Sequence, residues 1–296
     1  MRILLLGKNG QVGWELQRAL AVLGEVVAHD HDTADFGQPE SLAALVRSVE
    51  PQVIVNAAAH TAVDKAESEP EFARALNALA PGVLAREAAA LGAWMVHYST
   101  DYVFDGSGTA PWREDSPTGP LSVYGRTKLE GEQLIAESGC KHLIFRTSWL
   151  YAARGGNFAK TMLRLAAERD RLTVIDDQIG APTGADLLAD ITAHAIGTVH
   201  QQGQRPELAG TYHAVAAGTT SWHGYAKHVI EFARAAGRPI QVAADAIVPV
   251  PTSAFPTPAK RPTNSRLDTT RLRTAFDLTL PRWDQGVDRM LTEILG

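Results

Sequence analysis

The sequence is poor in cysteine, in charge of one sign and in long apolar runs. Its single cysteine, Cys140, excludes a disulfide within the chain and fits a reducing compartment, so we expect a cytoplasmic protein. A net charge of −5 gives no electrostatic case for binding nucleic acid or an anionic membrane. The apolar start is interrupted at Gly7 and Lys8, too early for a signal peptide, and no later run is long enough to cross a bilayer. Histidine-rich metal-binding spacing is also missing.

What the chain does have is an alternation of aliphatic strands with amphipathic helices. Its 296 residues, 45% of them hydrophobic, can bury a large core as one extended domain or two. We expect strands at residues 2–6, 25–29, 52–55, from 94 and at 141–147, with helices between them. This order is typical of a doubly wound parallel sheet of the Rossmann-like α/β class. We assign residues 1–150 to a dinucleotide-binding domain and 151–296 mainly to a smaller C-terminal α/β substrate-binding domain, with segments at about 170–178 and 187–216 returning to the first domain.

A glycine-rich turn follows the first strand. Gly7, Gly10 and Gly13 form G-x-x-G-x-x-G between that strand and an amphipathic helix. Such a turn lets the backbone approach a pyrophosphate at the positive end of the helix, which predicts a dinucleotide site. Asp30, near the end of the second strand, can accept hydrogen bonds from a ribose and would repel a 2′-phosphate, although a turn aspartate explains it too. Asp35 and Phe36 could enclose an adenine, but a buried Phe36 is equally natural.

The stretch from His97 to Lys128 carries the chemistry that we expect. Tyr124 and Lys128 are four residues apart, so they share one face of a helix. A lysine ammonium there would lower the pKa of the phenol, and Tyr124 could then act as a general acid toward a ketone oxygen. Thr100, at the tip of the fourth strand, could hydrogen-bond the same oxygen. The alternative is a tyrosine and a lysine on a solvated helix face.

Other candidates lie at the ends of the remaining elements. Small residues at the tip of the third strand permit a cofactor to come close, or pack tightly without one. Trp149 could stack on a flat base or sugar, or belong to the core. The guanidinium groups of Arg261 and Arg266 match phosphate oxygens, and surface ion pairs explain them equally well. Residues 106–121, rich in Gly, Pro, Ser and Thr, form a candidate flexible lid.

Together these motifs resemble the extended short-chain dehydrogenase/reductases and, within them, the enzymes that reduce dTDP-4-dehydrorhamnose. The resemblance covers nearly the whole chain and is most specific at residues 7–13, 56–64, 99–106, 124–128, 146–149 and 261–267. It implies Tyr124 as proton donor, Lys128 as its partner and ribose anchor, and Thr100 on the substrate oxygen. It also implies substrate contacts from Asp101 and Trp149, and a dinucleotide lining that, with the glycine turn, comprises Gln11, Val12, Asp30, Asp35, Phe36, Ala58, Ala59, His60, Thr61 and Tyr98.

The implied reaction transfers hydride from NADPH or NADH to C4 of dTDP-4-dehydro-L-rhamnose, giving dTDP-L-rhamnose, while Tyr124 protonates the oxygen. NADPH is the usual donor in the family, yet Asp30 favours the unphosphorylated ribose, so we expect use of both. Some members of the family are described as homodimers linked by magnesium through surface carboxylates. Glu15, Asp190 and Glu293 could be such Mg²⁺ ligands here, although solvated helix faces explain these residues as well. The rivals are another nucleotide-sugar reductase or epimerase on this scaffold, and a non-catalytic NADP-binding regulatory subunit.

Overall fold

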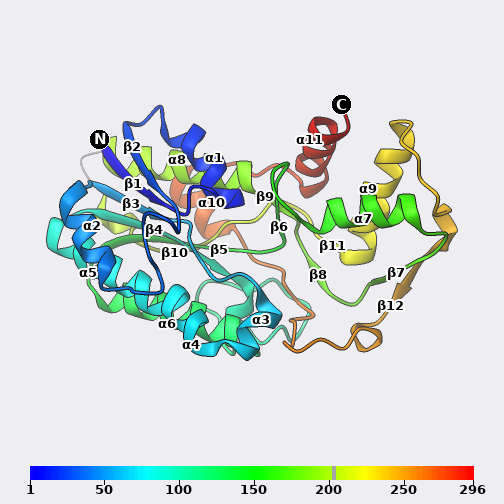
Figure 1. The fold of residues 1–296 in the computed structure, drawn as a ribbon, viewed down its shortest axis with the longest axis horizontal. Helices are drawn as coiled ribbons and strands as arrows, with labels where there is room; N and C mark the ends of the chain where they lie inside the picture. The colour runs from blue at the N-terminus through cyan, green and yellow to red at the C-terminus, as the bar shows by residue number, and fades with distance from the viewer. Residues whose placement is uncertain (202–204) are drawn as a thin grey trace.

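A six-stranded parallel sheet forms the larger part of the molecule in a computed structural model that describes residues 1–201 and 205–296 (Figure 1). The strand order is β10-β5-β4-β3-β1-β2. The bounds are β1 Arg2–Leu6, β2 Glu25–His29, β3 Val53–Asn56, β4 Trp94–Thr100, β5 Lys141–Thr147 and β10 Gly210–His213. The order reverses between β1 and β3, which is where open α/β sheets bind ligands. The predicted doubly wound fold is confirmed; β3 begins one residue later than expected.

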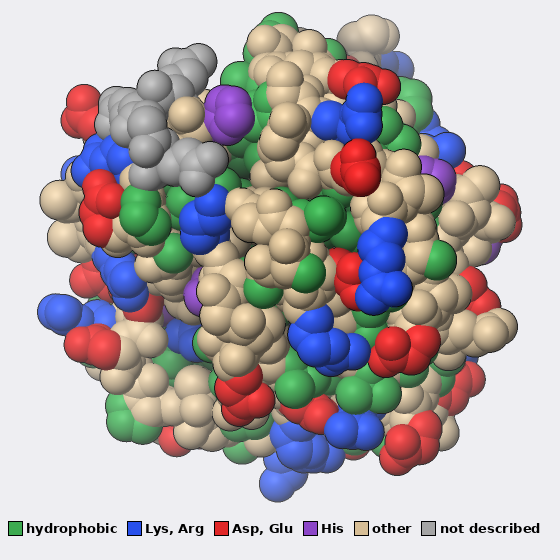
Figure 2. All heavy atoms as spheres, turned by 90° about the vertical axis from the view of Figure 1, so that its left-hand side faces the viewer, with side chains coloured by type: hydrophobic (Ala, Val, Ile, Leu, Met, Phe, Trp, Pro, Cys, Tyr) green, Lys and Arg blue, Asp and Glu red, His purple; other side chains and the backbone are tan. Residues whose placement is uncertain are grey.

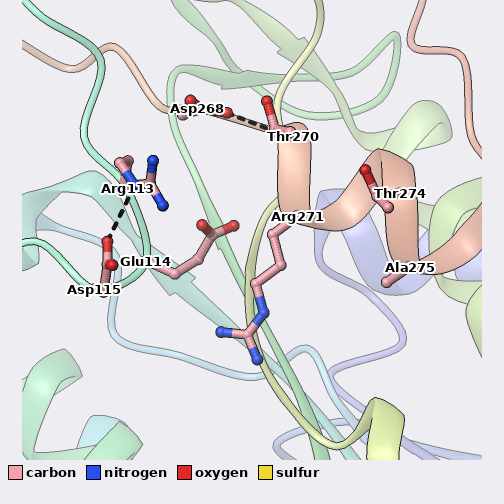
Figure 3. Close-up of a pocket in the computed structure, with 8 residues that line it drawn as sticks. All are labelled: Arg113, Glu114, Asp115, Asp268, Thr270, Arg271, Thr274 and Ala275. Atoms are coloured by element: carbon pink, nitrogen blue, oxygen red, sulfur yellow. Dashed lines mark hydrogen bonds and ion pairs between the residues drawn. The ribbon is translucent and has the colours of Figure 1, made fainter.

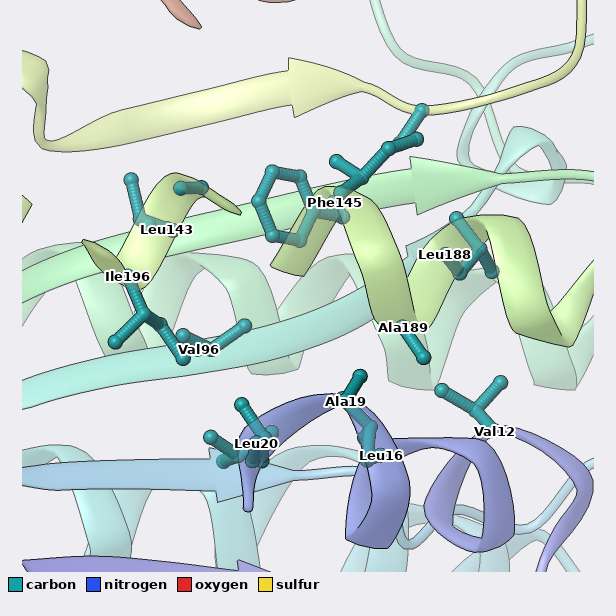
Figure 4. Packing of buried hydrophobic residues seen from close by; sticks show 14 of the residues in the cluster. Val12, Leu16, Ala19, Leu20, Val96, Leu143, Phe145, Leu188, Ala189 and Ile196 are labelled. Atoms are coloured by element: carbon teal, nitrogen blue, oxygen red, sulfur yellow. The ribbon is translucent and has the colours of Figure 1, made fainter. Parts of the chain in front are cut away.

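Helices cover both faces of this sheet because its strands are apolar on both sides. One face carries α1 (Gln11–Leu20) and α8 (Ala185–Gln201), which pack on Ile3, Leu5 and Phe145. Figure 4 shows that cluster, with Leu16 and Leu20 of α1 on one side of Val96 and Ile196 of α8 on the other. The opposite face, formed by the alternate strand residues, packs on α2 (Ser41–Val49), α5 (Ala80–Leu91) and α6 (Val123–Glu137).

The long helix expected at about residues 70–91 is interrupted by a π-helical turn. It consists of α4 (Pro70–Arg74), the π-turn at Ala75–Leu79 and α5, and it follows the short helix α3 (Val63–Ser68). Asn77 in the π-turn is fully buried and donates to the His60 carbonyl and to Thr127 Oγ1 of α6. A Cβ on Gly131 would come within 2.2 Å of the Asn77 carbonyl, so glycine allows α6 to approach closely. The turn thereby fixes the helix that carries Tyr124 and Lys128.

The smaller region has its own core and three two-stranded sheets. Its strands are β6 (Leu150–Tyr151) paired with β9 (Thr183–Gly184), β8 (Ile179–Gly180) with β11 (Thr220–Ser221), and β7 (Leu172–Ile175) with β12 (Ile247–Val250). Its helices are α7 (Phe158–Glu168), α9 (Trp222–Ala235) and α11 (Trp283–Leu295), and short 3₁₀ turns occur at Asp101–Val103, Pro206–Leu208, Ala244–Ala246 and Thr252–Ala254.

One expected return to the large sheet is wrong. Residues 170–178 were expected to rejoin the first domain, but β7 pairs in parallel with β12 in a sheet of its own. The local strand pattern was right, yet its partner comes about 75 residues later in the chain, and local sequence does not reveal such a partner. In the segment 187–216, α8 packs against α1 and β10 joins β5, while residues 202–204 lie outside the described residues. The helix α10 (Thr270–Phe276) packs near β10.

Acidic and basic side chains are mixed on one face of the molecule. Figure 2 shows Lys, Arg, Asp and Glu interspersed on the face at the left-hand end of Figure 1, with no field of one sign. Among the helices of the described residues, none is long and apolar enough to cross a membrane.

The loop at residues 106–121 is anchored to the segment at 262–268. Trp112 exchanges backbone hydrogen bonds with Arg266 and Asp268, and its indole donates to the Asn264 carbonyl. Asn264 donates in turn to the carbonyls of Ser107 and Ala110. The expected candidate lid is thus anchored along part of its length by backbone and side-chain hydrogen bonds.

Candidate active site

The glycine turn forms one end of a groove along the carboxyl ends of the strands. Gly7 has a φ of +87°, and a Cβ on Gly13 would come 2.0 Å from the Gly7 carbonyl, so both positions need glycine to let the turn close on helix α1. Gly10 is different, because a Cβ there would meet only the Gly7 carbonyl at 3.4 Å. Gly10 is therefore not required by packing, and its lack of a side chain leaves room in the groove.

The groove begins in a cavity of about 300 Å³ beside this turn. Its lining contains the expected residues Gly7, Gly10, Asp30, Asp35, Phe36, Ala58 and Ala59, together with Asn9, His31, Ala34, Gly37, Ala57, Phe72 and Leu76, which were not foreseen. Phe36 is a core residue and also lines this cavity, so packing in the core does not exclude it from the wall of the groove. Apolar rings facing a carboxylate at a glycine turn suit an adenosine.

Asp30 has preformed hydrogen-bond partners at the rim of this cavity. Asn9 Nδ2 donates to its carboxylate over 2.8 Å, and Lys8 Nζ lies 3.5 Å away. Partial desolvation alone would raise its pKa, but the hydrogen bond from Thr33 and the charge of Lys8 lower the pKa of Asp30 overall. The carboxylate therefore stays ionised and can accept hydrogen bonds at the rim of the cavity.

A second cavity of about 320 Å³ continues the groove and holds the expected catalytic groups. It shares Ala57 and Ala59 with the first cavity, and its lining includes Gln11, Val12, Thr61, Tyr98, Thr100, Asp101, Tyr124, Lys128 and Trp149. Strand β4 delivers Thr100, helix α6 delivers Tyr124 and Lys128, and Ser122 caps that helix by accepting from the Gly125 amide. Elements far apart in sequence thus bring together the three residues predicted to carry the reaction.

Lys128 is fully buried beneath Tyr124 and is held from two sides. Its Nζ donates to the Tyr98 carbonyl over 2.6 Å and lies 3.1 Å from His97 Nε2. Burial lowers the pKa of Lys128 to about 8, and the nearby Glu132 partly opposes this. Glu132 itself forms a buried ion pair with Arg146, 2.6 Å between Oε2 and Nη2.

The predicted lowering of the Tyr124 pKa is wrong for this structure. Desolvation raises the pKa of Tyr124 to about 12, against a hydrogen bond with Thr100 that lowers it. Burial of the phenol is the main cause, and Lys128 Nζ is engaged by the Tyr98 carbonyl and His97. A protonated phenol is nevertheless the form that a general acid requires.

Thr100 connects Tyr124 to a buried carboxyl group. Its Oγ1 donates to Asp101 Oδ1 over 3.1 Å, and the hydroxyl of Ser265 donates to the other carboxyl oxygen. Burial raises the pKa of Asp101 to about 6. Asp101 lines the catalytic cavity but is only 2% exposed.

A third cavity, of about 250 Å³, extends from the catalytic groups into the smaller region. Trp149 lines both, and its indole stacks on Trp222 with ring centroids 3.7 Å apart. The remaining lining is Tyr102, Phe158, Met162, Thr173, Val174, Ile175, Gln178, Trp222, Phe255, Arg261, Pro262 and Ser265. Flat aromatic walls with one guanidinium suit a planar base attached to phosphates. Trp222, Gln178 and Phe255 were missed because helix and loop patterns do not report which distant side chains share a cavity.

The two predicted arginines have different surroundings. Arg261 lines the third cavity and forms a bidentate pair with Asp64, with Nη2–Oδ2 and Nη1–Oδ1 distances of 2.7 and 3.1 Å. Arg266 donates to Asn264 Oδ1 and does not line any of the three cavities described above. His60 is also placed apart from them: it is buried against Asn77 and the ring of Phe72.

The acidic residues considered for Mg²⁺ do not form one cluster. Glu15 and Glu293 line a cavity of about 270 Å³ with Asp186, Arg18 and Arg289, whereas Asp190 pairs with Arg18 over 2.9 Å. Within residues 1–201 and 205–296, no three His, Cys, Asp or Glu side chains are placed to hold a metal ion.

Another cavity, of about 540 Å³, shares no lining residue with the groove. Figure 3 shows Arg113, Glu114 and Asp115 on one side and Asp268 and Arg271 of the other wall facing them, with an Arg113–Asp115 ion pair. Its charged groups are of both signs and include no residue expected to act in catalysis.

The fold and the groove define an oxidoreductase of the short-chain dehydrogenase/reductase type. The model of the RmlD substrate binding domain family matches residues 1–295. The chain is 59% identical over 298 residues to dTDP-4-dehydrorhamnose reductase of Escherichia coli K12, covering 99% of this chain and 98% of that one. It is 49% identical, over the full length of both chains, to the same enzyme of Burkholderia thailandensis.

A solved structure supports the same family assignment. The dTDP-4-dehydrorhamnose reductase of Bacillus anthracis, determined in complex with NADP, is 34% identical, covers 99% of each chain and has a TM-score of 0.89. The chain belongs to the dTDP-4-dehydrorhamnose reductase (RmlD) family. The family predicted from the sequence motifs is confirmed.

Proposed function

We propose that the groove reduces the C4 ketone of dTDP-4-dehydro-L-rhamnose, with Tyr124 as the proton donor. Membership of the family makes the chain an NAD(P)H-dependent dTDP-4-dehydrorhamnose reductase. The single observation that supports the residue roles is the cavity in which Tyr124, Thr100 and Lys128 meet, between a dinucleotide-like cavity and an aromatic one.

The residues of the groove fit a nicotinamide dinucleotide. The glycine turn leaves space beside Gly10, the Asp30 carboxylate is ionised at the rim, and alanines form the floor. We assign the adenosine end to Asp30, Asp35, Phe36 and Ala58, the pyrophosphate to Gly10, Gln11 and Val12, and the nicotinamide end to Ala59, Thr61, Tyr98 and Lys128. When bound, the reduced nicotinamide supplies the hydride that is added to C4 of the sugar.

The chain's own groups supply the proton and the orientation. Tyr124 gives its phenolic proton to the O4 oxygen as that oxygen gains negative charge, and Thr100 stabilises the same oxygen by a hydrogen bond. Without substrate the Thr100 hydroxyl donates its one proton to Asp101 Oδ1, so it turns from Asp101 to the O4 oxygen when the substrate is bound. The nucleotide end of the substrate, held by Trp149, Trp222 and Arg261, provides binding energy that positions C4.

We assign residues 1–150, together with the segment that forms α8 and β10, to dinucleotide binding and the rest of 151–296 to the substrate. For the cofactor we propose use of both NADPH and NADH. The Bacillus anthracis relative binds NADP, and Lys8 beside Asp30 could meet a 2′-phosphate, whereas Asp30 itself suits the unphosphorylated ribose.

The test is turnover of dTDP-4-dehydro-L-rhamnose by the purified chain with NADPH and with NADH, followed by loss of nicotinamide absorbance and by identification of the sugar product. We expect dTDP-L-rhamnose with either cofactor, and a lower kcat/KM when the base is uracil. Recovery of an unreduced epimer would contradict the proposal and favour the rival epimerase, whereas recovery of unchanged substrate would contradict it and favour the non-catalytic subunit.

A further inference from the structure

An ion pair joins helix α3 of the larger part of the molecule to the chain that lines the third cavity. Asp64 lies in α3 directly after Val63, which lines the catalytic cavity, and Arg261 lines the third cavity. The carboxylate and the guanidinium form two parallel contacts, 2.7 Å between Oδ2 and Nη2 and 3.1 Å between Oδ1 and Nη1. The two residues are 197 positions apart in the chain, so the pair is a long-range contact between the two parts.

The backbone on both sides of Arg261 is fixed by hydrogen bonds. The Ala259 amide donates to Asp64 Oδ1 over 3.2 Å. After Arg261, the Asn264 amide donates to the Gly106 carbonyl over 3.0 Å. The direction of the Arg261 guanidinium is therefore decided by its own partners, of which Asp64 is the only charged one among the described residues.

The free donors of Arg261 follow from counting. A guanidinium has five N–H groups. In Arg261, Nη1 and Nη2 each give one proton to Asp64, and Nη1 also donates to the Ala259 carbonyl over 3.2 Å. The remaining two protons, on Nε and Nη2, donate to no group within residues 1–201 and 205–296. They lie on one edge of the plane, which is a fork that matches two oxygens of a phosphate.

Stability alone does not account for this pair. The side chains of Arg261 and Asp64 are 25% and 42% exposed, and ion pairs so open to water contribute little to folding. The hydrogen bond from Arg261 lowers the pKa of Asp64, so the carboxylate is ionised at neutral pH. What the pair restricts is the rotation of a long side chain, and a side chain that is already oriented loses less entropy when a ligand binds.

The negative charge of Asp64 also acts on an anionic ligand, in the opposite direction. It repels a diphosphate, but water screens that repulsion at a carboxylate as exposed as this one. Orientation of the guanidinium is therefore the larger of the two effects.

We propose that Asp64 is a positioning residue that holds Arg261 with its Nε–Nη2 edge free for the diphosphate of the nucleotide sugar. No catalytic role is assigned to Asp64, because it acts through Arg261. The inference deepens the proposed function and rests on it for the identity of the ligand.

Binding of dTDP tests the proposal without turnover. Calorimetry on the full-length chain with NADPH present should show that Asp64→Ala weakens dTDP binding about fivefold. Thymidine, which has no phosphate, should bind equally to both forms. The control is Glu71→Ala, which removes one carboxylate from an exposed position in the first turn of α4 and should leave dTDP affinity unchanged. Should Asp64→Ala not fold, Asp64→Asn replaces it.

A double-mutant cycle with Arg261→Met separates orientation from other effects. Arg261→Met should itself weaken dTDP binding at least as much as Asp64→Ala does. In that background, Asp64→Ala should change dTDP affinity by less than twofold. An equal loss in both backgrounds would mean that Asp64 does not act through Arg261 and would overturn the proposal. Tighter dTDP binding by Asp64→Ala would overturn it too, since repulsion would then be the larger effect.

Kinetics add a second readout. In Asp64→Ala, KM for dTDP-4-dehydro-L-rhamnose should rise by a larger factor than kcat falls, and a loss confined to kcat would contradict the positioning of a binding group. If the reductase assignment fails, this kinetic result is lost while the dTDP cycle stands. Absence of dTDP binding to the unmodified chain would overturn the inference itself.

Discussion

Trp149 stacks on Trp222 at a ring-centroid distance of 3.7 Å while its backbone adopts a φ of +49°. A left-handed backbone at a bulky residue is costly and is found mainly where the surroundings fix it. Here Gly180 leaves the space that the indole needs, because a Cβ there would lie 2.7 Å from Trp149 Cε2. The ring that joins the catalytic cavity to the aromatic cavity is therefore held by a glycine and a second tryptophan.

Gly180→Ala should displace this indole. We expect KM for the nucleotide sugar to rise about tenfold, which corresponds to about 1.4 kcal/mol, with little change in NADPH affinity. Gly156→Ala is the matched control, since a Cβ at Gly156 meets nothing within 4 Å. Steady-state kinetics of the two variants decide the matter, and equal KM values for both would show that the position of Trp149 does not govern substrate binding.

Asp30→Ser should change the choice of cofactor. Removing the carboxylate removes its repulsion of a 2′-phosphate, so kcat/KM for NADPH relative to NADH should rise by about tenfold. The exposed Asp32 nearby provides the control Asp32→Ser, and Lys8→Ala, alone and combined, measures the opposing contribution of the lysine. An unchanged cofactor ratio in Asp30→Ser would leave Asp30 as a turn residue only.

The buried Asp101 makes stability depend on pH. Its pKa in the folded state is raised from 3.8 to about 6, so the folded state binds its proton more tightly than the unfolded state. Its contribution is fully present below pH 4 and is lost as the pH rises through about 6. Relative to the unmodified chain, Asp101→Asn should gain up to about 3 kcal/mol between pH 4 and pH 8. Thermal unfolding at the two pH values measures this, and a difference that does not depend on pH would refute it.

Most of the fold was predictable because its signals are local. The aliphatic strands, the glycine turn and the helix of Tyr124 each show in a short window, and residues 141–147 were placed without error. The partner of β7 was not predictable, since strand pairing is a long-range property. The same limit applies to the site: Trp149 was a candidate, whereas Trp222 and Gln178, supplied by other elements, were missed.

The charge states were the least predictable part. A tyrosine and a lysine one helical turn apart indicated a lowered phenol pKa, but burial of the phenol raises it, and Lys128 donates to the Tyr98 carbonyl. His97 and Tyr98, which hold Lys128, lie some 30 residues before it in the chain, so no spacing rule within the helix contains these contacts.

The central claim is that Tyr124 gives the proton to the sugar oxygen, and Tyr124→Phe tests it most directly. Single-turnover reduction of dTDP-4-dehydro-L-rhamnose should slow by roughly 10²–10⁴-fold, with NADPH affinity unchanged by calorimetry. Tyr102→Phe is the control, because Tyr102 packs edge-on against Tyr124 with ring centroids 5.5 Å apart and lines the same cavity. We predict that Tyr102→Phe keeps most of the rate. Near-normal turnover by Tyr124→Phe, or the full loss in Tyr102→Phe instead, would contradict the account.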